Sequence, residues 1–192
     1  MLFRSARADR SPGEFYQLDI EMSFIGQDDL FVILEGLFQH LTDKVSKKKI
    51  VANPFPRIKY MDAMNWYGSD KPDIRYEMKM QDVSSVFEGS EFRAFAANTS
   101  GKNCIKALVV PGKAGESRKF FDNLEKGVKK MGAKGLAYIN YTEEEVKGPI
   151  VKFLSEAELN NLKAQTGAKT GDSVLLVAAK GFQEIGTFGV GS

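Results

Sequence analysis

Four polar residues with alternating spacing are the first candidates for chemistry in this chain: Gln17, Asp19, Glu21 and Ser23, in the stretch FYQLDIEMSF at residues 15–24. Successive side chains of an extended strand point to opposite faces, so these four share one ridge, with apolar residues on the other face. Such a ridge can bind a cation or a hydrogen-bonding ligand. It is equally the water-facing side of a half-buried strand, which the periodicity by itself favours.

The whole chain has the composition of a soluble globular protein. It has 192 residues, of which 43% are hydrophobic and 27% charged, enough for one domain or two small ones. The net charge of +2 is too small to indicate nucleic-acid binding by itself.

Cysteine and histidine usage excludes several kinds of site. Cys104 is the single cysteine, so no internal disulfide can form, and a reducing compartment such as the cytoplasm is expected. With His40 as the single histidine, we expect no soft-metal site and assign no metal ligand. Cys104 lies in the apolar run CIKALVV, which predicts a core position, so no nucleophile and no catalytic residue is assigned. We find neither a membrane-spanning run nor a secretory signal.

The first part of the chain predicts helices around a proline-rich break. Residues 26–45 have an apolar stripe, aspartates in the first turn and Lys44 in the last, as expected of a helix. The prolines of NPFPRIKY predict a break followed by a short strand, and residues 60–67 a brief helix that ends at Gly68. The loop SDKPDIR is either a solvated turn or the charged lip of a cleft.

From about residue 76 onward, short apolar strands alternate with amphipathic helices. Two helices are predicted: residues 116–132, and residues 155–167 with a capping box of Ser155 and Glu158. Strands are predicted at residues 92–97, 104–110, 135–140, 149–154 and 171–179. We find no phosphate-binding loop, dinucleotide fingerprint or internal repeat.

Two long blocks carry a family resemblance. RADRSPGEFYQLDIEMSF and PFPRIKYMDAMNWYGSDKPDIR resemble the bacterial-type aspartyl-tRNA synthetases, the first block looking like motif 2 of the class II catalytic domain. In that family motif 2 is two antiparallel strands and a loop that contact ATP, the amino acid and the tRNA acceptor end. GAKGLAYI, GPIVKFLSEAEL and TGAKTGDSVLLVAAK resemble the insertion domain of these enzymes, called the GAD domain.

The resemblance implies both fold and function. The expected fold class is α+β: residues 1–75 as an antiparallel-sheet fragment of the catalytic domain, and residues 76–192 as an α+β GAD-type insertion domain. The implied activity is ATP-dependent activation of aspartate and its transfer to tRNA. ATP and Mg²⁺ are then the expected cofactors, and aspartate, ATP and tRNA the partners. The family is homodimeric through its motif 1.

The resemblance also gives the opening ridge a role. It implies that Gln17 and Asp19 lie in the aspartate pocket, with Asp19 facing the substrate ammonium. A carboxylate beside an ammonium forms a charge-assisted hydrogen bond, which suits this role in a partly dry pocket. For Glu21 and Ser23 the water-facing alternative stays open.

Three arginines precede the ridge. The resemblance implies that Arg4, Arg7 and Arg10 contact ATP or the tRNA acceptor end, because arginine presents forked donors that suit phosphate oxygens. A solvated N-terminal arm is the alternative.

The sequence departs from the family where motif 2 opens with Phe-Arg, one residue, and Glu. Counting back from RADR places Leu2 on the Arg position and Arg4 on the Glu position; a two-residue deletion aligns Phe3 and Arg4 with Phe-Arg but leaves no Glu. Motif 1, motif 3 and the anticodon-binding domain have no counterpart in these residues. The expectation is an incomplete chain that is inactive alone. The alternative is a non-catalytic module that binds RNA or protein through its GAD-type domain.

Overall fold

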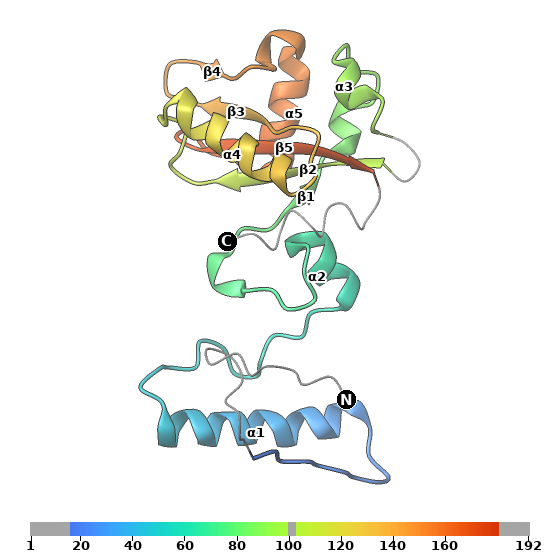
Figure 1. Ribbon diagram of the computed structural model, residues 1–192, viewed down its shortest axis with the longest axis vertical. Helices are drawn as coiled ribbons and strands as arrows, with labels where there is room; N and C mark the ends of the chain where they lie inside the picture. Colours follow the sequence, from blue (N-terminus) through green and yellow to red (C-terminus); the bar gives the residue numbers. More distant parts are fainter. Residues whose placement is uncertain (1–15, 100–102, 181–192) are drawn as a thin grey trace, which may run out of the picture. The chain divides into compact units, whose positions relative to one another are not determined.

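A computed structural model describes residues 16–99 and 103–180 of the chain. The contacts divide the chain into two units, with the division between Arg57 and Ile58. The predicted domain boundary near residue 75 lies further along the chain and stays a prediction. Figure 1 labels the α-helices and β-strands. The elements are α1 (Gln27–Val45), α2 (Tyr60–Tyr67), η1 (Ile74–Tyr76), β1 (Gln81–Asp82), η2 (Ser84–Phe87), α3 (Arg93–Ala96), β2 (Asn103–Val110), α4 (Arg118–Lys130), β3 (Ala137–Tyr141), β4 (Val146–Lys147), η3 (Val151–Phe153), α5 (Glu156–Thr166) and β5 (Ser173–Lys180), where η marks a 3-10 helix.

The predicted strand at residues 15–24 is not formed in the part of it that the structure describes. Residues 16–26 belong to no helix or strand. A lone extended segment has no neighbour to pair its backbone groups, so alternation by itself does not make a sheet. The apolar side of this segment is correspondingly uncovered: Tyr16 is 105%, Leu18 71% and Phe24 106% exposed.

Helix α1 forms where the sequence predicts it, held by polar contacts rather than by a core. Asp29 accepts a hydrogen bond from the backbone N–H of Gly26 at 2.9 Å, which caps the first turn. Arg57 pairs with Asp28, lies 3.6 Å from Glu35 and places its guanidinium over the ring of Phe31. No residue of α1 is buried.

The second unit contains a five-stranded sheet of order β1-β2-β5-β3-β4, in which every neighbouring pair is antiparallel. The longest ladder joins β2 to β5, from Asn103 opposite Lys180 to Val110 opposite Ser173. This confirms the α+β class with an antiparallel sheet, and it confirms the predicted strands at residues 104–110, 135–140 and 171–179.

One face of this sheet carries the hydrophobic core. Ile105, Ile139 and Val174 are fully buried on it, together with Phe87 of η2 and Leu162 of α5. Helix α5 has the predicted capping box, in which Ser155 and Glu158 bond each other's backbone N–H groups, and it ends at Gly167 with φ 69°. The apolar side of α5 is thereby fixed against the sheet.

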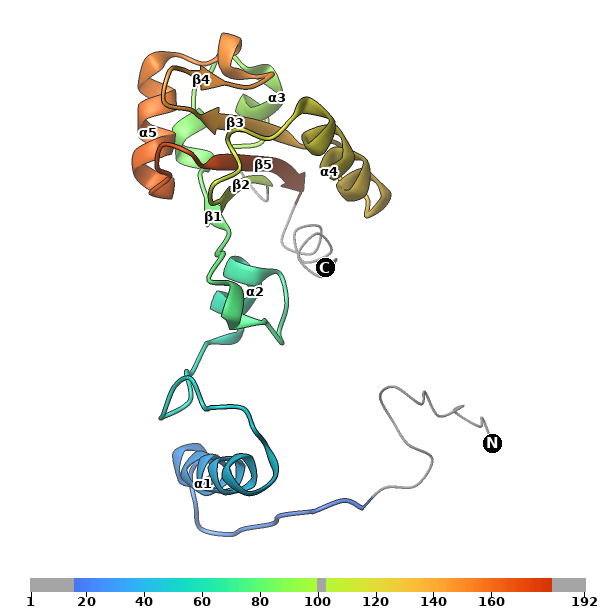
Figure 2. The same cartoon turned by 90° about the vertical axis from the view of Figure 1, so that its left-hand side faces the viewer.

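The opposite face is covered by α4, and Figure 2 shows α4 and α5 on opposite sides of the sheet. Phe121 of α4 stacks on Tyr138 of β3, with ring centroids 4.0 Å apart and planes 12° apart. Next to this stack, Ser173 donates a hydrogen bond to the side-chain oxygen of Asn140 at 2.8 Å. The sheet is therefore covered on both faces.

Three other predicted strands are wrong. Residues 92–97 contain α3 instead, because a helical turn brings Phe92 and Phe95 together, with ring centroids 4.9 Å apart, and lets Phe95 contact Phe87. Residues 149–154 contain the turn η3 rather than a strand. Residues 57–59, after the prolines, form no strand. In each case the predicted strand finds no neighbouring strand to pair with among the described residues.

Two glycine substitutions test the packing of the second unit. A Cβ on Gly148 would lie 2.4 Å from the carbonyl oxygen of Tyr138, whereas one on Gly127 in α4 would meet nothing within 4 Å. We expect Gly148→Ala to lower the free energy of unfolding by about 1–3 kcal/mol through overpacking. Gly127→Ala should raise it by about 0.5–1 kcal/mol through helix propensity. Urea unfolding of both variants and of the native chain measures these changes. Equal stability of the Gly148→Ala variant and the native chain would contradict the close approach at Gly148.

Candidate functional site

The structure brings two of the predicted site residues together. The side-chain nitrogen of Gln17 donates a hydrogen bond to Asp19 at 2.7 Å, so both side chains lie on one side of the extended segment. Both are exposed, as are Glu21 and Ser23. Among the described residues nothing encloses this ridge. Arg4, Arg7 and Arg10 lie outside the described residues.

The charged loop SDKPDIR is organised by its own side chains. Asp73 accepts hydrogen bonds from the side chain and the backbone N–H of Arg75, and these bonds lower the pKa of Asp73 to about 2. Lys71 pairs with the adjacent Asp70. The charges of the loop thus neutralise one another locally, which favours the turn over the charged lip.

A depression of about 610 Å³ lies between α2 and the β1–β2 edge of the sheet. The ammonium of Lys79 lies 4.2 Å from the centroid of the Trp66 ring. Lys106 is only 8% exposed, and its Nζ lies 3.5 Å from the Asp82 carboxylate on the neighbouring strand. Burial acts to raise the pKa of Asp82, but hydrogen bonds from Ser84 and the charge of Lys106 outweigh it and hold this pKa below its usual value. The ion pair joins β1 to β2 and explains the buried lysine.

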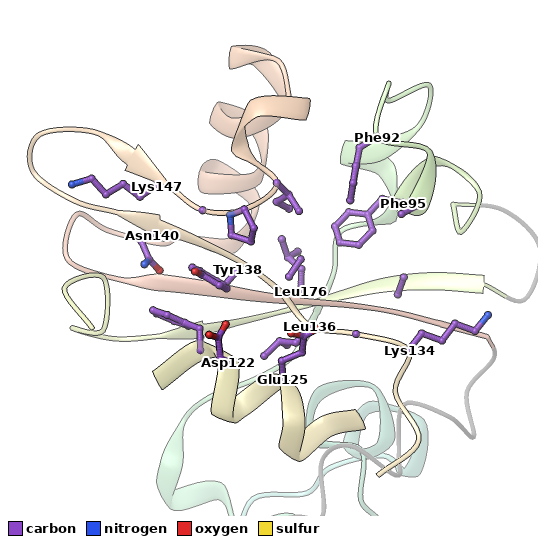
Figure 3. A pocket seen from close by; sticks show the side chains of 18 of the residues that line it. Phe92, Phe95, Asp122, Glu125, Lys134, Leu136, Tyr138, Asn140, Lys147 and Leu176 are labelled. Atoms are coloured by element: carbon purple, nitrogen blue, oxygen red, sulfur yellow. The ribbon is translucent and has the colours of Figure 1, made fainter. Parts of the chain in front are cut away.

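A groove of about 770 Å³ lies in the second unit, seen in Figure 3. Its lining comes from α3, α4, β3, the segment after β4, and β5. These residues are Phe92, Ala94, Phe95, Asn98, Glu116, Arg118, Phe121, Asp122, Glu125, Lys134, Gly135, Leu136, Ala137, Tyr138, Asn140, Lys147, Gly148, Pro149, Ile150, Leu176 and Ala178. No motif had indicated this groove, because its residues are scattered over half the chain and only the sheet brings them together.

The charges along the groove are balanced and mostly paired. Three carboxylates and three cationic side chains line it. Asp122 lies 3.9 Å from Arg118, and Glu125 lies 2.7 Å from Lys129, whose hydrogen bond lowers the pKa of the Glu125 carboxyl. Asn140 is 6% exposed, and its Nδ2 has no hydrogen-bond partner among the described residues. The groove is therefore suited to binding rather than to acid–base chemistry.

A metal centre has no support within the described part of the chain. No three His, Cys, Asp or Glu residues there are close enough to hold an ion. Cys104 is half-buried, and burial raises the pKa of its thiol, which leaves it a poor nucleophile. His40 is exposed on α1. Among the described helices we find none long and apolar enough to cross a membrane.

Comparisons with known proteins match both units. The family model of the GAD domain matches residues 95–186. The aspartate–tRNA(Asp/Asn) ligase of Chlorobium phaeobacteroides strain BS1 is 57% identical over 175 residues, which is 91% of this chain and 29% of the relative. The proteins of the same name from Prosthecochloris aestuarii and Chlorobaculum parvum give the same identity and coverage. The chain therefore spans under a third of the length of these curated relatives.

The Lys106–Asp82 pair gives a test of stability against pH. Asp82→Asn keeps the shape but leaves the Lys106 ammonium buried without its counter-charge, so we expect a loss of about 0.5–1.5 kcal/mol at pH 7. The lowered pKa of Asp82 means that this contribution is present above about pH 4 and is lost on acidification. The free energy of unfolding at pH 7 and at pH 3 measures this contribution. From pH 7 to pH 3 the Asp82→Asn variant should lose less stability than the native chain. An equal loss in both would show that the pair contributes nothing.

Proposed function

We propose that the chain, which matches the GAD domain model and is 57% identical over 175 residues to an aspartate–tRNA(Asp/Asn) ligase, contributes part of the site at which such an enzyme joins aspartate to tRNA. The supporting observation is the Gln17–Asp19 pair, in which an exposed carboxylate accepts a hydrogen bond from a neutral amide and has no cationic partner among the described residues. Asp19 is thus placed to accept hydrogen bonds from an incoming ammonium. The proposal includes aspartate, ATP and tRNA as ligands, the cytoplasm as location and the homodimer that the resemblance implies.

The reaction proposed for the whole enzyme has two steps. A carboxylate oxygen of aspartate attacks the α-phosphorus of ATP and pyrophosphate leaves; the 3′-terminal hydroxyl of the tRNA then attacks the activated carbonyl and AMP leaves. The residues of this chain act by position. Asp19 accepts hydrogen bonds from the ammonium, and Gln17 holds the Asp19 side chain in place. Arg4, Arg7 and Arg10 are proposed to contact the phosphates of ATP or of the tRNA acceptor end.

The described residues form no magnesium site made of protein ligands alone. Mg²⁺ in nucleotide sites is held by carboxylates together with phosphate oxygens. No group of three possible ligands occurs in the described part of the chain, and we derive no step through the ion. The exposed Asp19 suits a single ammonium better than a divalent cation, because among the described residues its hydrogen-bond partner is the neutral amide of Gln17.

The exposure of the ridge limits what the chain achieves by itself. Every buried hydrophobic residue among those described belongs to the second unit. Without a surrounding pocket, an ion pair between Asp19 and aspartate is worth at most about 1 kcal/mol, too little to hold the substrate. This observation favours the second candidate for the chain alone, a non-catalytic module that binds RNA or protein through its GAD domain.

We therefore expect the isolated chain not to activate aspartate. The measurement is aspartate-dependent exchange of labelled pyrophosphate into ATP, with a full-length aspartate–tRNA ligase as the positive control. Exchange clearly above the enzyme-free background would contradict the expectation and show that the ridge is enclosed in solution.

The role of Asp19 is tested in a full-length ligase that carries residues 16–57 of this chain. Asp19→Asn keeps size and removes the charge, so the aspartate concentration for half-maximal rate should rise roughly tenfold to a hundredfold. Stability should change by less than about 0.5 kcal/mol, since the residue is exposed. Glu21→Gln is the matched control, with the same chemical change on the same ridge. An unchanged aspartate dependence combined with a lowered melting temperature would make the ridge structural.

A further inference from the structure

The outer side of α4 carries a row of lysines. Because an α-helix has about 3.6 residues per turn, Lys119, Lys126 and Lys130 lie within about 40° of one another, roughly opposite Phe121. Phe121 is buried against the sheet, whereas all three lysines are exposed. In Figure 1, α4 lies in front of the strands, so its outer side faces the viewer. We call these three residues the lysine stripe, which runs for about 16 Å along the helix.

The carboxylates of α4 do not neutralise the lysine stripe. Asp122 lies 3.9 Å from Arg118, and Glu125 lies 2.7 Å from Lys129, so both acidic side chains of the helix pair with cations on its flank. Within the described part of the chain, no carboxylate forms an ion pair with a lysine of the stripe. The three ammonium groups therefore keep their full charge toward the solvent.

The segment around the stripe is basic, although the whole chain is nearly neutral. Residues 113–134 contain seven cationic and three acidic side chains, which gives this segment a net charge of +4, whereas the whole chain has +2. The rest of the chain is therefore net acidic. Such an asymmetry concentrates a positive field at one surface, and a field of this kind attracts a polyanion.

The lysine stripe does not help the helix to fold. Lys119 lies in the first turn, where the helix dipole favours acidic residues, and this turn contains none. Lys126 and Lys130 are four residues apart, which is the spacing at which like charges on a helix repel each other. A bound polyanion relieves both unfavourable interactions, so the stripe is better explained by binding than by stability.

We propose that the lysine stripe of α4 binds the phosphate backbone of RNA. Each ammonium contacts phosphate oxygens as a point charge and releases condensed counterions, so the binding does not depend on base sequence. The stripe is long enough to contact several phosphates, because a nucleic-acid strand carries one charge every few ångströms. The inference rests on the RNA-binding alternative for the GAD domain. It does not involve Gln17 or Asp19, so its failure leaves their proposed role unchanged.

An acidic protein or an anionic membrane fits the stripe less well than RNA. Protein interfaces are held mainly by apolar and aromatic anchors, and a helix that lies on a membrane inserts apolar side chains. Among the described residues, none of the exposed large hydrophobic side chains lies on α4. The apolar side of the helix is already packed, with Phe121 stacked on Tyr138. A phosphate backbone requires only cations, which is what the outer side of α4 offers.

The test measures binding of the full 192-residue chain to a fluorescently labelled hairpin RNA whose stem has about 16 base pairs of arbitrary sequence. The triple variant Lys119→Gln, Lys126→Gln and Lys130→Gln should bind this RNA about tenfold to hundredfold more weakly than the native chain. The logarithm of the association constant falls linearly with the logarithm of the salt concentration. The magnitude of that slope should decrease by about 2–3 in the variant, because each lost phosphate contact removes about 0.7–0.9.

Two matched triple variants separate the stripe from the net charge of the chain. Lys47→Gln with Lys48→Gln and Lys49→Gln makes the same change of charge at three exposed lysines of the first unit. It should leave the affinity within about twofold and the salt slope unchanged. Replacing the three lysines of the stripe by arginine keeps the charge and should keep the affinity within about threefold. Because all six lysines are exposed, folding should be retained, and circular dichroism checks it.

Four results would overturn the proposal. The native chain does not bind the RNA; or the glutamine variant of the stripe binds it with the native affinity and salt slope. The third is an equal loss in the variant of Lys47, Lys48 and Lys49, which would show an effect of net charge alone. The fourth is that polyglutamate, or vesicles that contain phosphatidylserine, bind the stripe more tightly than the RNA does. The stripe would then be a surface for an acidic protein or for a membrane.

Discussion

The antiparallel ladder between β2 and β5 is the interaction on which the second unit depends. It pairs Asn103–Val110 with Ser173–Lys180 along their whole length, the longest strand pairing in the described chain. Every other strand joins this pair directly or through β3. Because the paired segments are far apart in sequence, the ladder closes a long loop. That loop contains β3 and β4, which extend the sheet, and α4 and α5, which cover its two faces.

The unequal lengths of the strands around this ladder create the groove. Strand β3 pairs with only half of β5, and β4 stops where Gly148 lies against the Tyr138 carbonyl and Pro149 follows. Side chains from both faces of the sheet therefore reach one edge. The same geometry explains why the groove has an apolar side toward the core and a charged side toward α4, since successive residues of a strand face opposite ways.

The described part of the first unit is held by exposed polar contacts rather than by a buried core. Its helix is capped by Asp29 and joined to the following segment by Arg57, and none of its described residues is buried. Exposed polar contacts of this kind are individually weak and do not replace a core. The apolar residues of α1 and of residues 16–25 that are exposed form a side of this unit against which no other described residue packs closely. A candidate aspartate ridge that borders such a surface becomes a pocket only when neighbouring structure covers it.

Local interactions explain what the sequence by itself determined about this protein. The capping box of Ser155 and Glu158, the stops at Gly68 and Gly167 and the acidic start of α1 all act within one or two turns of chain, and the predicted helices formed with these ends. The run CIKALVV forms the strand β2. The resemblance of several blocks to the aspartyl-tRNA synthetases is confirmed by the aspartate–tRNA ligases that the comparisons found. Tertiary structure decided the rest, because a strand exists only with a partner. Residues 16–24 alternate perfectly yet pair with no strand among the described residues. Phe95 packs on Phe92 and on Phe87, which turned an apolar run into α3, and the groove arose where β4 fails to follow β3.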